Sequence, residues 1–207
     1  MLHGLVDEDF QKTLESYYAE GIEYTLARAG KNPYKIGVPF IWCSNNLATS
    51  LAAQIILYEK MAGPRMAGSR QTGSRLTGSR LTGSRLTGTG KYSRYLTLQR
   101  DWLFGRNPWG TSMFTGIPEN GEHPREVHTS LYALKKMEIP GGLVDGPVYA
   151  SIYNNLLGIH LVFPDEFAEV QNHFVVYHDD LGDYSTNEPT MDGTAGALLM
   201  MAHFSHY

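Results

Sequence analysis

Residues 44–63 read SNNLATSLAAQIILYEKMAG, and this stretch decides the fold class. Its larger apolar residues recur at intervals of three or four, at Leu47, Leu51, Ile55 and Tyr58. This spacing places them on one face of a helix, as expected for a helix that packs against a protein core. Ser44 is a suitable N-cap, and the pair Gly63-Pro64 supplies a stop.

The same spacing recurs along most of the chain. Outward from the first stretch, we predict helices over residues of about 8–28, 91–104, 146–160, 164–178 and 191–205. No stretch shows sustained alternation of apolar and polar residues, which would be typical of a strand. We therefore predict an all-α fold.

Composition and charge exclude several classes of protein. The chain has 207 residues, of which 42% are hydrophobic and 18% charged, so it can bury a sizeable core. Its net charge of −4 disfavours a nucleic acid as the main partner, because phosphate binding needs a surplus of Lys and Arg. Its apolar runs are shorter than the roughly 20 residues that span a bilayer, so we expect no membrane partner, and Met1–Phe10 lacks the features of a signal peptide. Cys43 cannot form an internal disulfide, and we expect a small buried side chain there.

A repeat of five residues lies at about 64–90. It places Arg at 65, 70, 75, 80 and 85, each followed three residues later by Gly. A period of five matches neither helix nor strand, and the glycines make a continuous helix costly. We expect a flexible surface loop, with a basic binding strip as the alternative.

The acidic segment YHDDLGDYSTNEP, residues 177–189, is the first candidate for chemistry. Asp179, Asp180, Asp183 and Glu188 fall within ten positions, and such crowding favours a protonated carboxyl group that could act as a general acid. Gly182 and Pro189 favour a loop in which these carboxylates converge. The alternative is a solvated acidic turn or an N-cap cluster for the last helix. A metal site that also uses His173 and His178 matches no known ligand spacing, so we expect no metal and no other cofactor.

A second candidate segment is DWLFGRNPWGTSMFTG, residues 101–116. Trp109 and Phe114 stand there among small polar residues, and aromatic faces beside hydroxyl and amide groups suit a sugar ring. Trp102 follows the apolar stripe of the preceding helix, so we expect it in the core.

Taken together, these segments resemble the catalytic domain of glycoside hydrolase family 9. The match rests on FGRNPWGTSMFTG, on PENGEHPREVHTS and on YHDDLGDYSTNEPTMDGTA, in the order of the family. The resemblance implies inverting hydrolysis of β-1,4-glucosidic bonds in cellulose or related β-glucans, by an enzyme built as an (α/α)6 barrel. Six predicted helices are half of the twelve in such a barrel, so residues 1–207 are expected to form roughly its C-terminal half, interrupted by the repeat.

The resemblance also implies roles for single residues. Glu188 corresponds to the general acid, and Asp179 to the second signature carboxylate, which supports the charge and geometry of the site. His128 matches the substrate-binding histidine, and His123 with Arg125 is the alternative alignment. Tyr184, Trp109 and Arg125 complete the expected substrate-binding set.

An inverting enzyme needs a second carboxylate as base, about 6.5–9.5 Å from the acid. The Asp-Ala-Gly-Asp motif that provides this base in the family does not occur in this sequence. We therefore expect a fragment that lacks the upstream base and that self-associates through exposed apolar helix faces. A β-glucan or oligosaccharide is the expected partner, and a full-length parent would be secreted or periplasmic. The alternative functions are a non-catalytic carbohydrate-binding domain and a purely structural helical domain.

Overall fold

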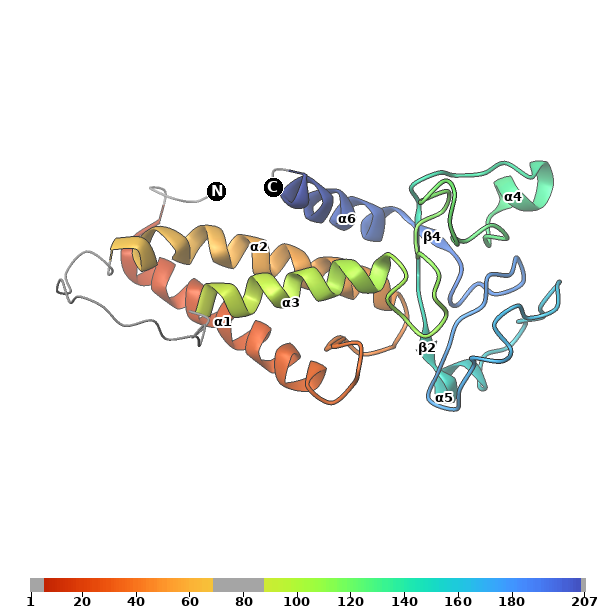
Figure 1. Ribbon diagram of the computed structural model, residues 1–207, viewed down its shortest axis with the longest axis horizontal. Coiled ribbons are helices and arrows are strands. Elements are labelled where there is room, and N and C mark those ends of the chain that lie inside the picture. Colours follow the sequence, from red (N-terminus) through yellow and green to blue (C-terminus); the bar gives the residue numbers. More distant parts are fainter. Residues whose placement is uncertain (1–5, 69–87, 206–207) are drawn as a thin grey trace, which may run out of the picture.

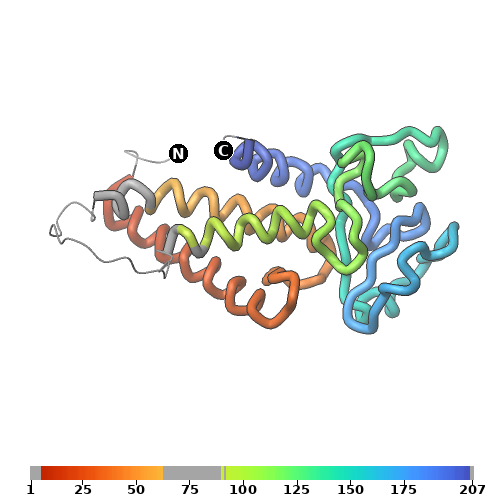
Figure 2. The backbone as a smooth tube through the Cα atoms, viewed as in Figure 1, coloured from red at the N-terminus to blue at the C-terminus, as the bar shows by residue number. Residues whose placement is uncertain are grey.

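The computed structural model describes residues 6–68 and 88–205. Four long helices, α1 (Glu8–Ala29), α2 (Ser44–Gly68), α3 (Gly88–Leu103) and α6 (Met191–Phe204), form what we call the helical body (Figure 1). Residues 104–190 form the loop region, which lies at one end of these helices (Figure 2). The described residues are mostly helical, as expected for part of an (α/α)6 barrel.

The helical body is held together by apolar packing around α2, which contacts α1, α3 and α6. Leu51 and Ile55 from the predicted stripe are at most 3% exposed, and Trp102 at the end of α3 is 2% exposed, as predicted. Burial of such side chains is the main stabilising contribution in a helical layer. None of the described helices is long and apolar enough to cross a membrane.

Four of the predicted helices are confirmed, with changes at their ends. The helix at 44–63 continues past Pro64 to Gly68, because a proline removes one helical hydrogen bond without forbidding continuation. Ser44 is not its cap, since the helix begins there and the Ser44 hydroxyl donates to the carbonyl of Pro147 (2.7 Å). The centre of the repeat, residues 69–87, lies outside the described residues, and its two ends belong to α2 and α3.

Two predicted helices are wrong in the loop region. In place of 146–160, only α5 (Ala150–Tyr153) is helical, because the preceding strand β2 (Val148–Tyr149) pairs antiparallel with β3 (Val175–Val176). That pairing also occupies the end of 164–178, whose earlier residues form turns in place of a helix. A short helix that was not predicted, α4 (Ser130–Lys135), is capped by the Thr129 hydroxyl.

A second antiparallel pair positions the candidate acid. Strand β1 (Leu143–Val144) pairs with β4 (Pro189–Thr190), and the register places Val144 opposite Pro189. Glu188 therefore lies immediately before β4, at the junction of the loop region and α6.

Candidate active site

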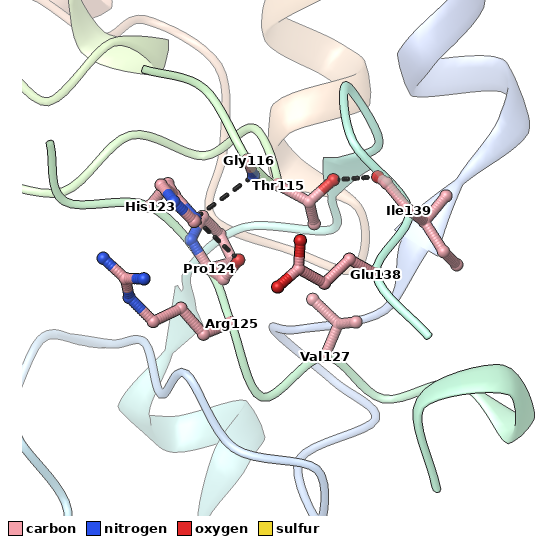
Figure 3. A pocket seen from close by; sticks show the side chains of 8 residues that line it. All are labelled: Thr115, Gly116, His123, Pro124, Arg125, Val127, Glu138 and Ile139. Atoms are coloured by element: carbon pink, nitrogen blue, oxygen red, sulfur yellow. Dashed lines mark hydrogen bonds between the residues drawn. The ribbon is translucent and has the colours of Figure 1, made fainter. Parts of the chain in front are cut away.

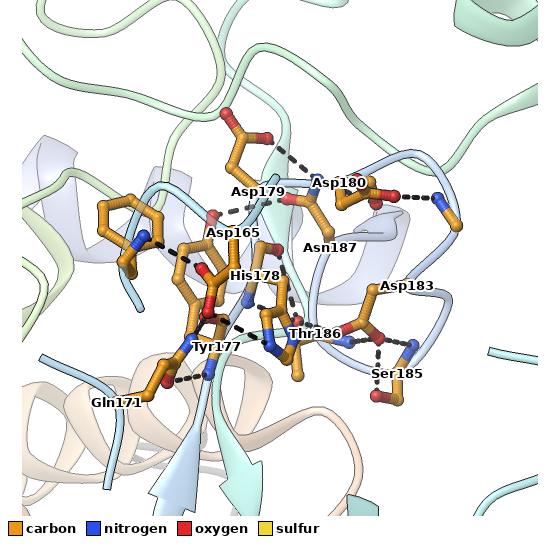
Figure 4. A network of polar contacts seen from close by, with 12 residues as sticks. Asp165, Gln171, Tyr177, His178, Asp179, Asp180, Asp183, Ser185, Thr186 and Asn187 are labelled. Atoms are coloured by element: carbon orange, nitrogen blue, oxygen red, sulfur yellow. Dashed lines mark hydrogen bonds and ion pairs between the residues drawn. The ribbon is translucent and has the colours of Figure 1, made fainter. Parts of the chain in front are cut away.

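Asp183 is the most heavily bonded carboxylate of the acidic segment (Figure 4). It is fully buried and accepts hydrogen bonds from the amide and hydroxyl groups of Ser185 (2.8 and 2.6 Å) and from the Thr186 hydroxyl (2.9 Å). The Nδ1 atom of His178 lies 2.8 Å from its second oxygen. Burial alone would raise the pKa of Asp183, but the hydrogen bonds from His178 and Ser185 outweigh it and hold the pKa below its usual value. Asp183 thus stabilises the loop as a carboxylate.

The carboxylate of Asp180 also binds backbone N–H groups of the loop region. It is 3% exposed and accepts backbone N–H groups from Val162 (2.9 Å), Phe163 (2.8 Å) and Gly182 (2.6 Å). The bonds to Val162 and Phe163 join the acidic segment to the neighbouring loop. Asp180 therefore has no free oxygen with which to activate water.

Asp179 joins the acidic segment to the loop that carries the candidate histidines. It accepts the backbone N–H groups of Arg125 (2.7 Å) and Glu126 (3.0 Å) and the side-chain amide of Asn187 (2.9 Å). Burial raises the pKa of Asp179, and these hydrogen bonds oppose the rise. Asn187 directly precedes Glu188. By binding the Asn187 side chain, Asp179 therefore helps to fix the backbone next to the candidate acid.

Glu188 differs from the three aspartates. Its side chain is exposed, and no residue in the described part of the chain donates a hydrogen bond to its carboxylate. Only its backbone is held, since its carbonyl accepts the N–H of Asp145 at 2.9 Å. Of the four carboxylates of the acidic segment, Glu188 alone is both exposed and unbonded, as a group that must reach a ligand should be.

His128 lies beside Tyr184 of the acidic segment. The rings of the two residues are 6.1 Å apart, and the backbone N–H of His128 donates to the carbonyl of Asn187 (3.0 Å). The Nδ1 atom of His128 lies 2.6 Å from the carbonyl oxygen of Leu181, which fixes the ring and directs Nε2 elsewhere.

Trp42 joins this group, and sequence analysis missed it. Its side chain is 44% exposed, and its ring lies 5.8 Å from that of Tyr184, tilted by 33°. Trp42 precedes α2 and lies outside the apolar stripe of that helix, a position that could have indicated an exposed role. With Tyr184, it presents an exposed aromatic surface of a kind that a sugar ring can contact.

Trp109 is not placed for substrate binding. The structure buries it in the core at 6% exposure, where its ring contacts Trp102 and Tyr177 at centroid distances of 6.2 and 5.5 Å. Its indole N–H donates to the side chain of Gln171 (3.3 Å). The turn-rich sequence around it suggested an exposed loop, but the ring packs inward because the aromatic cluster offers a larger apolar contact.

His123 and Arg125 line a small pocket with Thr115, Gly116, Val127 and Glu138 (Figure 3). The Nδ1 atom of His123 accepts the backbone N–H of Gly116 at 3.1 Å, so this ring braces the turn. Arg125 is exposed, and its guanidinium lies 3.5 Å from the carbonyl of Gly121. In the described ranges, no group of three or more His, Cys, Asp or Glu residues is arranged to hold a metal ion.

Comparison with solved structures gives the same architecture. The GH family 9 endoglucanase J30 has a TM-score of 0.66 and 25% identity over 96% of this chain and 32% of its own. AaCel9A in complex with cellobiose-like isofagomine has a TM-score of 0.63 and 21% identity, over 98% of this chain and 33% of its own. A single mutant of a thermostable endoglucanase from Alicyclobacillus acidocaldarius has a TM-score of 0.63 and 22% identity, over 97% of this chain and 32% of its own.

The chain thus spans about a third of the length of these structures. No curated protein matches it. The family model for glycosyl hydrolase family 9 matches residues 3–201, which include the whole acidic segment and the helical body except the last residues of α6. On this match, the chain belongs to glycosyl hydrolase family 9.

Proposed function

We propose that this chain carries the acid half of the active site of an inverting β-1,4-glucanase, with Glu188 as the general acid. The observation that carries the proposal is the contrast between Glu188 and its neighbours. The carboxylates of the three aspartates accept hydrogen bonds from the loop region, whereas the carboxyl group of Glu188 is exposed. A general acid needs such freedom to reach the leaving glycosidic oxygen.

The surrounding residues support a sugar as the ligand. Trp42 and Tyr184 offer an aromatic surface for the apolar face of a pyranose ring, and His128 supplies a ring nitrogen for its hydroxyl groups. We infer a substrate of β-1,4-linked glucose, in keeping with the endoglucanase relatives. Arg125, on the exposed rim of the adjacent pocket, is a further substrate-binding candidate.

The base is proposed to come from outside these residues. The bonding of Asp179, Asp180 and Asp183 leaves none of them free to activate water on the opposite face of the sugar. We infer that a preceding portion of the barrel supplies the base and covers the helical body. Exposed apolar side chains on α1 and α6 support this inference, with Tyr17 66% exposed and Met191 90% exposed. Without that cover, the same faces are expected to drive self-association.

The test is cleavage of a soluble β-1,4-glucan by the purified chain, with and without azide as an external nucleophile. Cleavage is followed by the fall in viscosity and by mass spectrometry of the products, because a glycosyl azide has no reducing end. Azide attacks the anomeric carbon from the face opposite the leaving oxygen, which takes the proton of Glu188, so the product is an α-glycosyl azide. We expect Glu188→Gln to abolish azide-dependent cleavage and Glu169→Gln, an exposed glutamate on another loop, to leave it unchanged. Cleavage that survives Glu188→Gln would exclude this residue as the acid. Oligosaccharide binding without cleavage in either condition would favour a carbohydrate-binding domain instead.

A further inference from the structure

Asp145 lies directly opposite Glu188. The β1–β4 register pairs Leu143 with Thr190 and Val144 with Pro189, and the Asp145 N–H donates to the Glu188 carbonyl at 2.9 Å. The same register therefore continues one step beyond the strands. Side chains that lie opposite each other in an antiparallel pair are neighbours, with Cβ atoms about 5 Å apart.

The backbone of Asp145 is held on both sides. Its N–H is bound to Glu188, and its carbonyl accepts the N–H of Asn45 at 2.9 Å. The next residue, Gly146, has φ +88°, and a Cβ atom there would meet the Asn45 side chain at 2.3 Å. Asp145 is thus fixed between α2 and the segment that carries Glu188, and its side chain is 1% exposed.

The carboxyl group of Asp145 is incompletely paired in this position. Its Oδ1 atom is buried and has no hydrogen-bond partner among the residues that the structure describes. A buried oxygen without a partner is costly, and far more so on a charged carboxylate than on a neutral acid. The geometry therefore favours the protonated form of Asp145.

The titratable groups that act on Asp145 come from three parts of the chain. They are the Cys43 thiol before α2, Asp183 and Glu188 in the acidic segment, and Asp192 in the first turn of α6. The thiol is hydrogen-bonded to the carboxyl group, and the other three groups are acids. Burial first, and then the charges of Glu188, Asp192 and Asp183, raise the pKa of Asp145 to about 8. At pH 7, Asp145 is consequently a neutral acid beside the exposed Glu188.

We propose that Asp145 is a positioning residue for Glu188. Its backbone holds the segment before β4 against α2, and its side chain, on losing its proton, places a second negative charge beside the Glu188 carboxyl group. The proposal rests on the assignment of Glu188 as the general acid. Asp145 then keeps its proton through neutral pH, and Glu188 has a neutral neighbour there. Ionisation of Asp145 sets the upper pH limit of the arrangement in which Glu188 works.

Carbon-13 NMR of the side-chain carboxyl groups tests this without any catalytic activity. In the unmodified chain, we expect the Asp145 carboxyl resonance to titrate near pH 8 and the Glu188 resonance to show an inflection at that pH, because its neighbour becomes charged. In Asp145→Asn, the inflection of Glu188 should disappear. In Asp9→Asn, which removes an exposed carboxylate from the first turn of α1, it should remain.

Two results would overturn the proposal. One is an Asp145 resonance that titrates near the ordinary aspartate value of about 4, which the unmodified chain alone reveals even if Asp145→Asn does not fold. The other is an inflection of Glu188 near pH 8 that persists in Asp145→Asn. Neither result depends on hydrolysis, so failure here and failure of Glu188 as the acid are separate outcomes.

Discussion

The helical body and the loop region are stabilised by different interactions. In the helical body, α2 packs apolar side chains such as Ile55 and Leu51 against the surrounding helices. In the loop region, which has only two-residue strands and two short helices, buried carboxylates bind backbone N–H groups. Apolar packing tolerates substitutions that conserve side-chain volume. A buried carboxylate, in contrast, depends on a specific set of hydrogen-bond donors. The site is therefore held by polar bonds, on a support that is held by apolar packing.

The largest expected effect is in the loop region. Asp183→Ala removes the acceptor for Ser185, Thr186 and His178, and their buried polar groups lose their partner. We expect the free energy of unfolding to fall by about 3–5 kcal/mol, measured by urea denaturation. Hydrogen exchange should increase first over residues 160–190, and the exposed control Asp9→Ala should change little. Equal loss of protection in α2 would mean that the two regions unfold as one unit.

A core truncation examines the helical body in the same way. Ile55 is fully buried, and Ile55→Ala should lower the free energy of unfolding by about 3 kcal/mol through lost burial and a residual cavity. Here hydrogen exchange should increase across α1, α2 and α3. Leu198→Ala on α6, whose side chain is 67% exposed, serves as the control and should change stability by less than about 0.5 kcal/mol.

The two regions also differ in how far the sequence predicts them. Helices α1, α2, α3 and α6 were predictable because each carries an apolar stripe with helical spacing. Residues 146–160 and 164–178 carry similar spacing, yet Val148–Tyr149 pairs with Val175–Val176, a contact between segments more than 20 residues apart that no local pattern reveals. The position of Glu188 in the acidic segment was predictable from its resemblance to a family signature. The burial of Trp109 and the exposure of Trp42 depend on tertiary packing, and so does the burial of Asp145.

A smaller effect is expected where the two regions meet. Gly146 has φ +88°, and Gly146→Ala would also bring a Cβ atom to 2.3 Å from the Asn45 side chain at the start of α2. Gly158 is a matched control, because its φ is +82° and nothing lies within 4 Å of the added Cβ. We expect Gly158→Ala to cost about 1 kcal/mol, for the left-handed backbone alone, and Gly146→Ala about 2 kcal/mol. Equal losses of unfolding free energy in the two variants would show that the Asn45 side chain moves aside without a cost in stability.

The smallest effect on stability is expected at the proposed acid itself. The Glu188 side chain is exposed, and no hydrogen bond from the described residues reaches its carboxylate. Glu188→Gln should therefore change the free energy of unfolding by less than about 0.5 kcal/mol, while it removes the proton that cleavage requires. Urea denaturation of this variant, compared with Asp183→Ala, separates the two classes of carboxylate in one segment. A loss of several kcal/mol at Glu188 would place it with the structural aspartates, because a side chain that the fold needs is not free to give its proton to a substrate.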